Sequence, residues 1–310
     1  MEYLAEEQVR ELLTYEALIP AVERALIDLS AGKIQQPLRS ILRVPEHDGL
    51  FGLMPAVDGD LIGVKMVSLY EGNARPGEAQ ASALPTHQAV IQLLSAQTGE
   101  PLVAMDGRLI TEMRTAAVSA VAVRLLAPEN AKVLTILGSG VQARSHIRAL
   151  RLVRNFTDVR VWSRTEAHAR RFADESGARV LPSAEEAVRG ADVVVNVAAT
   201  RVPLVQGAWL RPGMVVCAVA TVGPDRRELD DAAMQGFLVV ESRPSAMRES
   251  GDLIGANLEP NAELGELLAG NRPPASPEKW VIFKSLGVGA TDLAAARLVW
   301  RERGNLTRKS

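Results

Sequence analysis

Residues 133–143 read VLTILGSGVQA, an apolar run that leads into Gly138, Ser139 and Gly140 and then into a helical pattern. A helix that begins at such a turn presents unpaired N–H groups and the positive end of its dipole to whatever lies there. The stretch therefore predicts an anion site, and the order strand, glycines, helix favours the pyrophosphate of a dinucleotide as the anion.

The neighbouring sequence favours a cofactor over a glycine turn that merely ends a strand. A second strand, predicted at 159–163, follows one βαβ unit later, and Ala143 occupies the third fingerprint position, where a small residue allows close helix packing. The residues expected to bind the cofactor in this loop and first helical turn are Gly138, Ser139, Gly140, Val141 and Gln142.

The end of the second strand is where the adenosine ribose of the cofactor is expected. NAD enzymes usually carry Asp or Glu there, whereas this chain has Ser163, Arg164 and Thr165. A guanidinium between two hydroxyls suits a 2′-phosphate, so the triplet favours NADP(H), with NAD(H) as the alternative. The competing interpretation is a solvent-facing turn in which Thr165 caps the next helix.

Strands and helices alternate strictly around this motif. Apolar strands are predicted at 132–137, 159–163, 192–198, 214–220, 237–242 and 281–286, with helices at 141–153, 166–176 and 184–189. Near-continuous apolar strands indicate burial on both faces of a sheet. Residues 126–287 are therefore predicted to form a Rossmann domain, a doubly wound parallel sheet of the α/β class.

The rest of the chain has a different pattern and is predicted to form a second, α+β domain. A helical pattern over 6–30 precedes strands at 38–44, 49–57 and 61–70, which suggest a meander, then strands at 87–95 and 101–106 and a helix at 111–126. A helix predicted at 292–302 is expected to return to this domain, which makes it discontinuous, with residues 1–125 and 288–310.

Composition argues against several classes of partner and site. The 310 residues include 35 basic and 37 acidic side chains, a net charge of −2, so we expect neither nucleic acid nor a membrane as a partner. Cys217 is the single cysteine, and His47, His87, His146 and His168 lack the spacing of metal ligands. This spacing predicts no metal site. Because the sequence has no recognisable signal peptide or membrane span, we expect a cytoplasmic protein.

Three cations stand where a cation is costly. Lys65 interrupts the apolar strand LIGVKMVSL, Arg39 lies in the strand-like PLRSIL, and Arg114 lies in the first turn predicted for the helix 111–126, where it opposes the dipole. Together they predict a carboxylate pocket, because Arg binds a carboxylate through two N–H groups and Lys adds a point charge. The alternative is that each reaches solvent separately.

Eight segments resemble the ornithine cyclodeaminase and mu-crystallin family. In chain order they are QPLRS (36–40), VKMVSLYEG (64–72), PTHQAV (85–90), MDGRLITEMRTAA (105–117), LGSGVQA (137–143), RELDD (227–231), ESGDL (249–253) and VIFKSLG (281–287). The resemblance implies a homodimer, in which the N-terminal domain binds substrate and pairs across a two-fold axis while the Rossmann domain holds NAD(P)(H).

The resemblance also implies roles for individual residues. Arg39, Lys65 and Arg114 would hold the substrate carboxylate, and the segment with Thr86, His87 and Gln88 would approach the cofactor; otherwise His87 is a buried packing histidine. The remaining candidate cofactor-binding residues are Thr115, Thr200, Val219, Ser285, Leu286 and Gly287.

One loop departs from the pattern of ornithine cyclodeaminases, which resemble one another in G-x-D-x-P-G-K-x-E-L after the fifth strand, where the Asp handles the substrate amine. The loop here reads TVGPDRREL (221–229), which puts Val222 in the place of that Asp. Asp225 is the nearest acid and a candidate catalytic residue, or else it caps a helix predicted to start near Glu228. The loop is more similar to that of the ketimine reductase branch.

These features predict an NAD(P)H-dependent reductase that converts a 2-imino carboxylate into an L-amino acid. Its substrate would be a cyclic ketimine, such as pyrroline-2-carboxylate or piperideine-2-carboxylate, or a simple imino acid. Lys65 is the first candidate for handling the imine proton and Asp225 the second. The alternatives are an ornithine cyclodeaminase or alanine-type amino acid dehydrogenase, and a non-catalytic NADPH-dependent binder of a small ligand.

Overall fold

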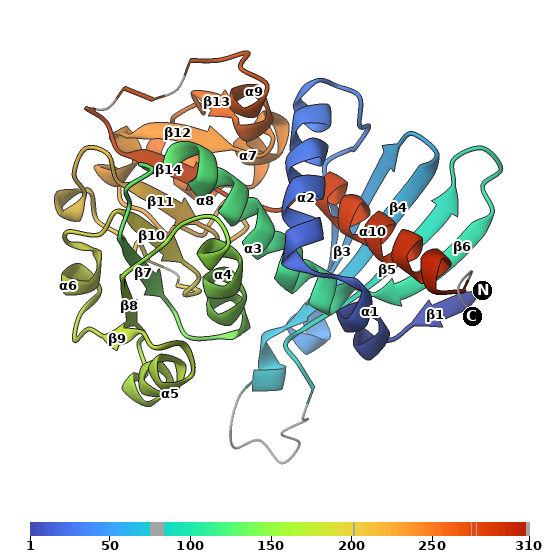
Figure 1. Cartoon of the computed structure of the whole chain (residues 1–310), viewed down its shortest axis with the longest axis horizontal. Coiled ribbons are helices and arrows are strands. Elements are labelled where there is room, and N and C mark those ends of the chain that lie inside the picture. Colours follow the sequence, from blue (N-terminus) through green and yellow to red (C-terminus); the bar gives the residue numbers. More distant parts are fainter. Residues whose placement is uncertain (75–83, 201, 274, 277, 308–310) are drawn as a thin grey trace. The chain divides into compact units, whose positions relative to one another are not determined.

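The structure is a computed structural model that describes residues 1–74, 84–200, 202–273, 275–276 and 278–307 (Figure 1). The chain divides into two compact units, one of Met1–Arg114 with Val288–Ser310 and one of Thr115–Gly287. The sequence placed this division after residue 125, whereas it falls earlier, inside the helix α3 (Gly107–Leu126).

The first unit is built on a six-stranded sheet with the strand order β1-β6-β5-β4-β3-β2. The strands are β1 (Glu2–Leu4), β2 (Ser40–Val44), β3 (Gly49–Asp58), β4 (Leu61–Tyr70), β5 (His87–Ser95) and β6 (Pro101–Asp106). Strands β2 to β6 pair antiparallel, which confirms the predicted meander. The short β1, which pairs parallel with β6, is too brief to show a period in sequence.

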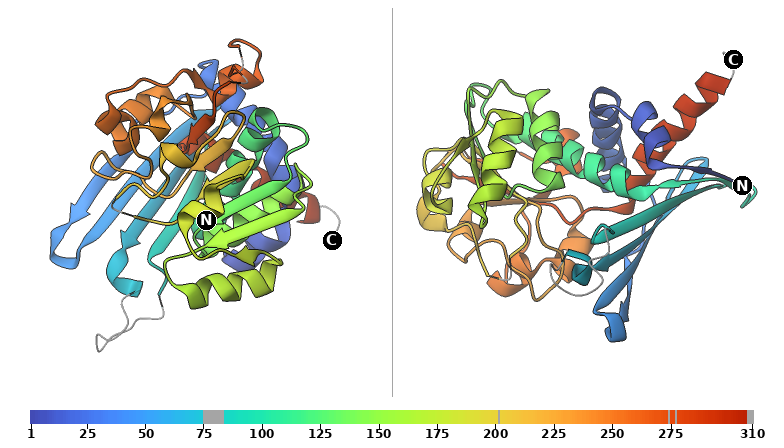
Figure 2. Two further views of the ribbon diagram at one scale, coloured as in Figure 1. Left: turned by 90° about the vertical axis from the view of Figure 1, so that its left-hand side faces the viewer. Right: turned by 90° about the horizontal axis from the view of Figure 1, so that it is seen from below.

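Helices cover one face of this sheet (Figure 2). They are α1 (Glu6–Leu12), α2 (Tyr15–Ser30) and α10 (Gly289–Thr307). The unit also contains two single turns between strands, η1 (Pro45–His47) and η2 (Glu71–Ala74). The helix predicted over 6–30 is two helices, because the Thr14 hydroxyl accepts the Ala17 N–H and starts a new one. Helix α10 contacts α2, β3 and β4, and an added Cβ at Gly63 would lie 2.8 Å from the Leu293 side chain.

The register of the sheet decides which side chains face α10. Lys65 on β4 pairs with Met54 on β3 and Ile91 on β5, so these side chains share one face. Gly63, two positions from Lys65 on the same strand, contacts α10, so this is the helix-covered face. Alternate positions of β3, β4 and β5 place partly exposed apolar side chains on the opposite face: Leu53, Pro55, Ile62, Val64, Met66 and Val90.

The second unit is an eight-stranded sheet in which every strand pair is parallel. Its order is β13-β12-β14-β11-β10-β7-β8-β9, with β7 (Val133–Leu137), β8 (Asp158–Trp162), β9 (Arg179–Val180), β10 (Val193–Asn196), β11 (Val215–Ala218), β12 (Phe237–Val240), β13 (Ala262–Glu263) and β14 (Val281–Lys284). Because β7 lies between β8 and β10, the strand order reverses there, and such sheets bind ligands beyond the strand ends at that point.

The helices around this sheet are α4 (Val141–Arg151), α5 (Glu166–Ser176), α6 (Ala184–Val188), α7 (Arg243–Glu249), α8 (Gly251–Ala256) and α9 (Leu264–Leu268), with single turns η3 (Gly207–Trp209) and η4 (Ala233–Gln235). The predicted doubly wound sheet is confirmed, and every residue of β10 and β11 is buried. Burial raises the pKa of Cys217, on β11, to about 12, which leaves the thiol protonated and unreactive.

Candidate active site

A buried cluster of charges lies on the helix-covered face of the first unit. Lys65 on β4 and Asp292 in the first turn of α10 are each 2% exposed at their side chains, and Lys65 Nζ lies 2.7 Å from Asp292 Oδ2. Arg114 Nε donates to the other oxygen, Asp292 Oδ1, at 2.9 Å. A single carboxylate therefore serves two buried cations, and the three groups together carry an excess of positive charge.

The cluster shifts the proton affinity of its members. Burial lowers the pKa of Lys65 to about 7, with Arg114 and Arg39 adding to the effect and Asp292 opposing it. Burial alone would raise the pKa of Asp292, but Arg114 and Lys65 outweigh it, so that pKa is lowered. Burial, Lys65 and Arg114 lower the pKa of His87, at the start of β5, to about 4, so its imidazole is neutral near pH 7.

The cations that the sequence singled out are thus brought together, although not all for the reasons given. Arg39, partly exposed, directly precedes β2 and is close enough to Lys65 to lower its pKa. The helix of Arg114 begins at Gly107, with Asp106 Oδ1 accepting the Leu109 N–H at 2.9 Å, so Arg114 does not lie in the first turn. The dipole argument was wrong, and burial beside a carboxylate is what distinguishes Arg114.

Asp292 was not predicted as a site residue. An Asp in the first turn of a helix normally complements the dipole and faces water. The signal that could have identified it is the apolar run around it, GATDLAAA (289–296), in which an acid needs a cationic partner once the helix is buried.

The glycine loop of the second unit fits the pyrophosphate of a dinucleotide. Gly138 has φ +113°, and an added Cβ would lie 3.0 Å from the backbone nitrogen of Ala198. Gly140 precedes α4, and the described residues leave the space around its missing Cβ open. Gly140 is the N-cap residue of α4 and has no side chain that could accept an N–H of the first turn, which suits this helix end to binding an anion.

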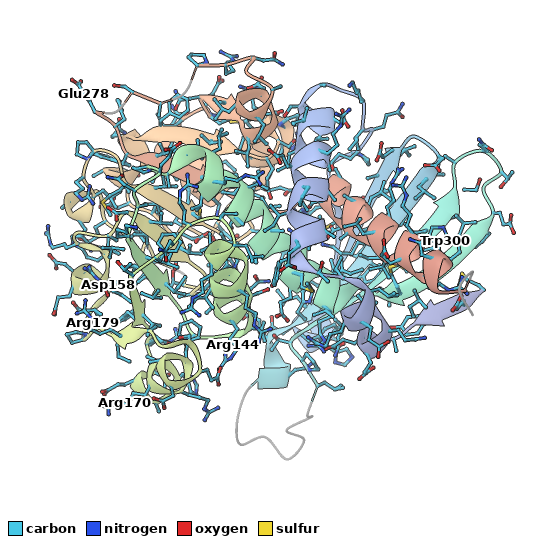
Figure 3. The ribbon with its side chains drawn as sticks, in the orientation of Figure 1. Arg144, Asp158, Arg170, Arg179, Glu278 and Trp300 are labelled. Atoms are coloured by element: carbon cyan, nitrogen blue, oxygen red, sulfur yellow. The ribbon has the colours of Figure 1, made fainter. Side chains whose placement is uncertain are left out.

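Two contacts join the parts of this loop. Arg144 on α4, labelled in Figure 3, donates through Nη1 to the carbonyls of Ser139 at 2.8 Å and Gly140 at 3.3 Å, and its guanidinium pairs with Glu175 on α5. The Ser139 hydroxyl donates to the Ser163 hydroxyl at 3.0 Å, which links the two predicted cofactor segments. Arg144 was not predicted, because a helical arginine after the fingerprint reads as a surface residue.

Arg164 and Thr165 are exposed beyond the end of β8. Thr165 occupies the N-cap position of α5, yet within the described chain its hydroxyl accepts no N–H from the helix, so the interpretation of Thr165 as a side-chain cap was wrong. No ion pair formed by the described residues involves Arg164, so its exposed guanidinium is available to bind an anion.

A second buried cluster joins the loops beyond the strand ends of the second unit. Lys284, the last residue of β14, contacts Glu228 and lies 3.3 Å from Asp252 Oδ2, with all three side chains at 2% exposure or less. Burial alone would lower the pKa of Lys284, but Glu228 and Asp252 outweigh it, so that pKa is raised. Glu228 also accepts N–H groups from Asn196, Ala220 and Thr221, at 2.7 to 3.0 Å.

This cluster fixes the loop after β11. The Glu228 carboxylate accepts hydrogen bonds from both the N–H and the hydroxyl of Thr221, and Lys284 Nζ donates to the Thr221 carbonyl at 2.9 Å. The next residue, Val222, therefore has a defined and exposed position. Asp225 lies in an exposed turn of the same loop. The described chain has no helix starting near Glu228, so the predicted cap at Asp225 was wrong; Asp230 instead accepts the Ala233 N–H of η4.

The other candidate cofactor residues use polar groups within their own unit. Glu241 accepts the Ser285 hydroxyl and the N–H groups of Leu286 and Gly287, at 2.7 to 2.9 Å. Four further hydrogen bonds involve these residues: Thr200 Oγ1 donates to the Val202 carbonyl, the Val219 N–H to the Asn196 carbonyl, the Tyr70 N–H to the Thr86 carbonyl, and Gln88 Nε2 to the Pro85 carbonyl. Thr115 is buried in α3. These contacts shape the loops, and they leave the cofactor roles as predictions.

The described residues contain neither a metal site nor a membrane-spanning helix. They include no group of three or more His, Cys, Asp or Glu side chains arranged to hold a metal ion. Nor do they include a helix with the length and apolar character needed to cross a bilayer.

The fold and the glycine loop define a two-domain protein with a Rossmann nucleotide-binding unit. The chain belongs to the ornithine cyclodeaminase/mu-crystallin family, whose sequence model matches residues 2–305. It is similar to ketimine reductase mu-crystallin of Mus musculus, at 42% identity over 307 residues, 96% of each chain.

Two solved structures resemble the whole chain. Δ(1)-pyrroline-2-carboxylate reductase of Thermococcus litoralis, in complex with NADH and L-proline, is 33% identical with a TM-score of 0.92, covering 99% of this chain and 98% of that one. An archaeal alanine dehydrogenase dimer with bound NAD is 29% identical with a TM-score of 0.91, covering 100% and 97%.

Replacing Lys284 by Met tests the buried cluster of the second unit. The change leaves Glu228 and Asp252 buried without their cation, so we expect a loss of about 3–5 kcal/mol in the free energy of unfolding. Lys279→Met, at an exposed lysine, is the matched control and should change the free energy by less than about 0.5 kcal/mol. Urea unfolding followed by circular dichroism measures both, and equal stability of the two variants would contradict the assignment.

Proposed function

We propose that this protein is an NAD(P)H-dependent reductase of 2-imino carboxylates that yields an L-amino acid. The observation that carries the proposal is the cluster in which Asp292 bridges Lys65 and Arg114, since it offers buried positive charge for a carboxylate and a proton at Lys65. The family relatives support the same reaction, because the mouse relative is a ketimine reductase and the Thermococcus litoralis relative a pyrroline-2-carboxylate reductase.

In the proposed reaction Arg114 and Arg39 bind the substrate carboxylate and so orient the C=N bond beside it. The reduced nicotinamide, when bound, supplies a hydride to the imine carbon. Lys65 gives a proton from Nζ to the imine nitrogen, so that one hydride and one proton add across C=N and leave C–H and N–H bonds. A pKa of about 7 suits this role, because the ammonium is present near neutral pH and gives its proton up readily.

The protein's own groups also support particular assignments within this reaction. The N–H groups at the start of α4 would hold the pyrophosphate of the cofactor. Asp225 is exposed in a turn, whereas Lys65 is buried beside two other charged groups, so Lys65 is the proposed proton donor. The side chain of Val222 carries no group that could accept or donate a proton at a second amine. This argues against ornithine cyclisation and for reduction of a preformed imine.

Turnover measurements test the proposed reaction. We expect NADPH oxidation with pyrroline-2-carboxylate or piperideine-2-carboxylate, and neither ammonia nor proline from ornithine with NAD⁺. Lys65→Met should lower kcat by at least about a hundredfold, the usual worth of general acid catalysis. Ammonia release as fast as ketimine reduction would favour a cyclodeaminase, whereas tight NADPH binding without turnover of any imino acid would favour a non-catalytic binder.

NADP(H) is the cofactor that we propose for the second unit, with Arg164 as the residue that binds its 2′-phosphate. Arg164→Ala should weaken NADPH binding by about 1.5–3 kcal/mol, the worth of hydrogen bonds to a charged group, and leave NADH binding nearly unchanged. Arg170→Ala is a matched control, because Arg170, labelled in Figure 3, is an exposed arginine on α5 and its ion pair with Glu166 lies within that helix. Fluorescence titration of the unchanged protein and both variants with NADPH and with NADH measures these affinities, and an equal loss for both cofactors in Arg164→Ala would contradict the proposal.

We also propose that the chain forms a homodimer through the uncovered face of the first unit's sheet. The helices of this unit lie on the other side (Figure 2), and the apolar side chains of this face, Leu53, Pro55, Ile62, Val64, Met66 and Val90, are only partly buried. The archaeal alanine dehydrogenase, which is a dimer, supports a second copy of this chain as the partner.

Leu53→Glu places a charge in this proposed interface and should convert the dimer to a monomer. Light scattering during size-exclusion chromatography should give twice the chain mass of 33.3 kDa for the unchanged protein and the single mass for the variant. Leu152→Glu, at an exposed leucine of the other unit, should remain dimeric. A monomeric unchanged protein, or a dimeric Leu53→Glu variant, would overturn the proposal.

A further inference from the structure

We propose that carboxylate binding at the Lys65–Asp292–Arg114 cluster is coupled to proton uptake by Lys65, and that Asp292 is the positioning residue that sets the pH range of this coupling. The inference rests on the proposed function in one respect, which is that the ligand of the cluster is a carboxylate. It adds that the substrate prepares its own proton donor on arrival.

The charge balance of the cluster is the first step. Asp292 offers one negative charge to Lys65 at 2.7 Å and to Arg114 at 2.9 Å, and both cations are almost entirely removed from solvent. Arg114 keeps its charge at every pH relevant to a protein, so it accounts for the charge of Asp292. A protonated Lys65 therefore adds an uncompensated buried charge, and loss of its proton is the means by which the cluster relieves that cost.

The charged and titratable groups around Lys65 come from several elements of the first unit, while its neighbour on β3 is the uncharged Met54. Asp292 on α10 favours the ammonium, whereas Arg114 on α3 and Arg39 ahead of β2 disfavour it. His87 on β5 is neutral from mildly acidic pH upward, because burial and the two neighbouring cations lower its pKa to about 4. Lys65 is thus the group of the cluster that titrates near pH 7.

An incoming carboxylate changes this balance. It brings the second negative charge that the two buried cations lack, and so it favours the ammonium form of Lys65. By linkage, a site whose pKa rises on binding takes up a proton over the pH range between its free and its bound pKa, and the affinity falls as pH rises through that range. A neutral analogue of the same shape brings no charge and should take up no proton.

Asp292 sets where this range lies. Asn at this position keeps the size of the side chain and removes its charge, so the pKa of Lys65 should fall in both the free and the bound protein. The coupling should then appear at lower pH. A purely structural role for Asp292 would alter stability, or affinity at all pH values alike, and would leave this pH range where it is.

Calorimetry of the NADPH-bound protein tests the coupling directly. The probe is pyrrole-2-carboxylate, a planar ring acid without a reducible C=N bond, titrated in pairs of buffers that differ in ionisation enthalpy. We expect almost no proton uptake at pH 5.5, where Lys65 already holds its proton, and most of one proton per site at pH 8. Affinity should fall up to tenfold per pH unit above pH 7. Pyrrole-2-carboxamide should show no such trend.

Variants assign the proton. Lys65→Met should abolish uptake at pH 8, and continued uptake there would overturn the assignment to Lys65. Asp292→Asn should show more uptake at pH 5.5 and less at pH 8 than the unchanged protein, and an unchanged profile would overturn the role of Asp292. The measurement on the unchanged protein needs no variant to fold, so carboxylate binding without proton uptake between pH 5.5 and 8 is by itself decisive against the coupling.

Failure of this inference is distinguishable from failure of the proposed function. Proton-coupled binding of pyrrole-2-carboxylate by a protein that reduces no imino acid would support the coupling and contradict the reductase. Ketimine reduction by a protein that binds the probe without proton uptake would do the reverse. Absence of any carboxylate binding would overturn the coupling together with the carboxylate site.

Discussion

The ion pairs that Asp292 makes with Lys65 and Arg114 exemplify the constraint on which both units depend, namely that a buried charge needs a partner. In the buried cluster of the second unit, carboxylates outnumber cations, since Lys284 contacts both Glu228 and Asp252. The oxygens of these carboxylates also accept backbone N–H groups. In the buried cluster of the first unit, cations outnumber carboxylates, because Lys65 and Arg114 share Asp292. A cluster with its counter-charges complete holds loops in place, whereas one that lacks a negative charge is suited to bind an anion.

The parts of the fold that were predictable are those with a strong period. The run DVVVNVA (192–198) reads as a strand buried on both faces, and β10 is buried throughout. Tertiary context decided the rest: the break at Thr14 lies inside an uninterrupted helical pattern, and β1 exists because β6 offers it an edge. The turns of α7, α8 and α9 are too short to show a helical period.

The site was predictable where a residue contradicts its surroundings. Lys65 is a charge inside an apolar strand, and Gly138 and Gly140 punctuate the strand–helix boundary, so both features are visible in sequence. Asp292 and Arg144 look ordinary at their own positions and become significant only through Arg114 and the loop carbonyls, which are 178 and four to five residues away in the chain. Arg114 was the right residue for a wrong reason, because the helix start was misplaced.

The motifs that carry the family resemblance divide into two kinds once their contacts are known. RELDD, ESGDL and VIFKSLG supply Glu228, Asp252 and Lys284, which meet in one buried cluster and so specify the shape of the loop after β11. Their presence therefore indicates a shared scaffold. The residue that this scaffold exposes, Val222, belongs to none of them. Because buried contacts hold the backbone at Thr221, the side chain of the next residue is exposed and makes no part of the core, so this position can differ between proteins that share the scaffold without altering the fold.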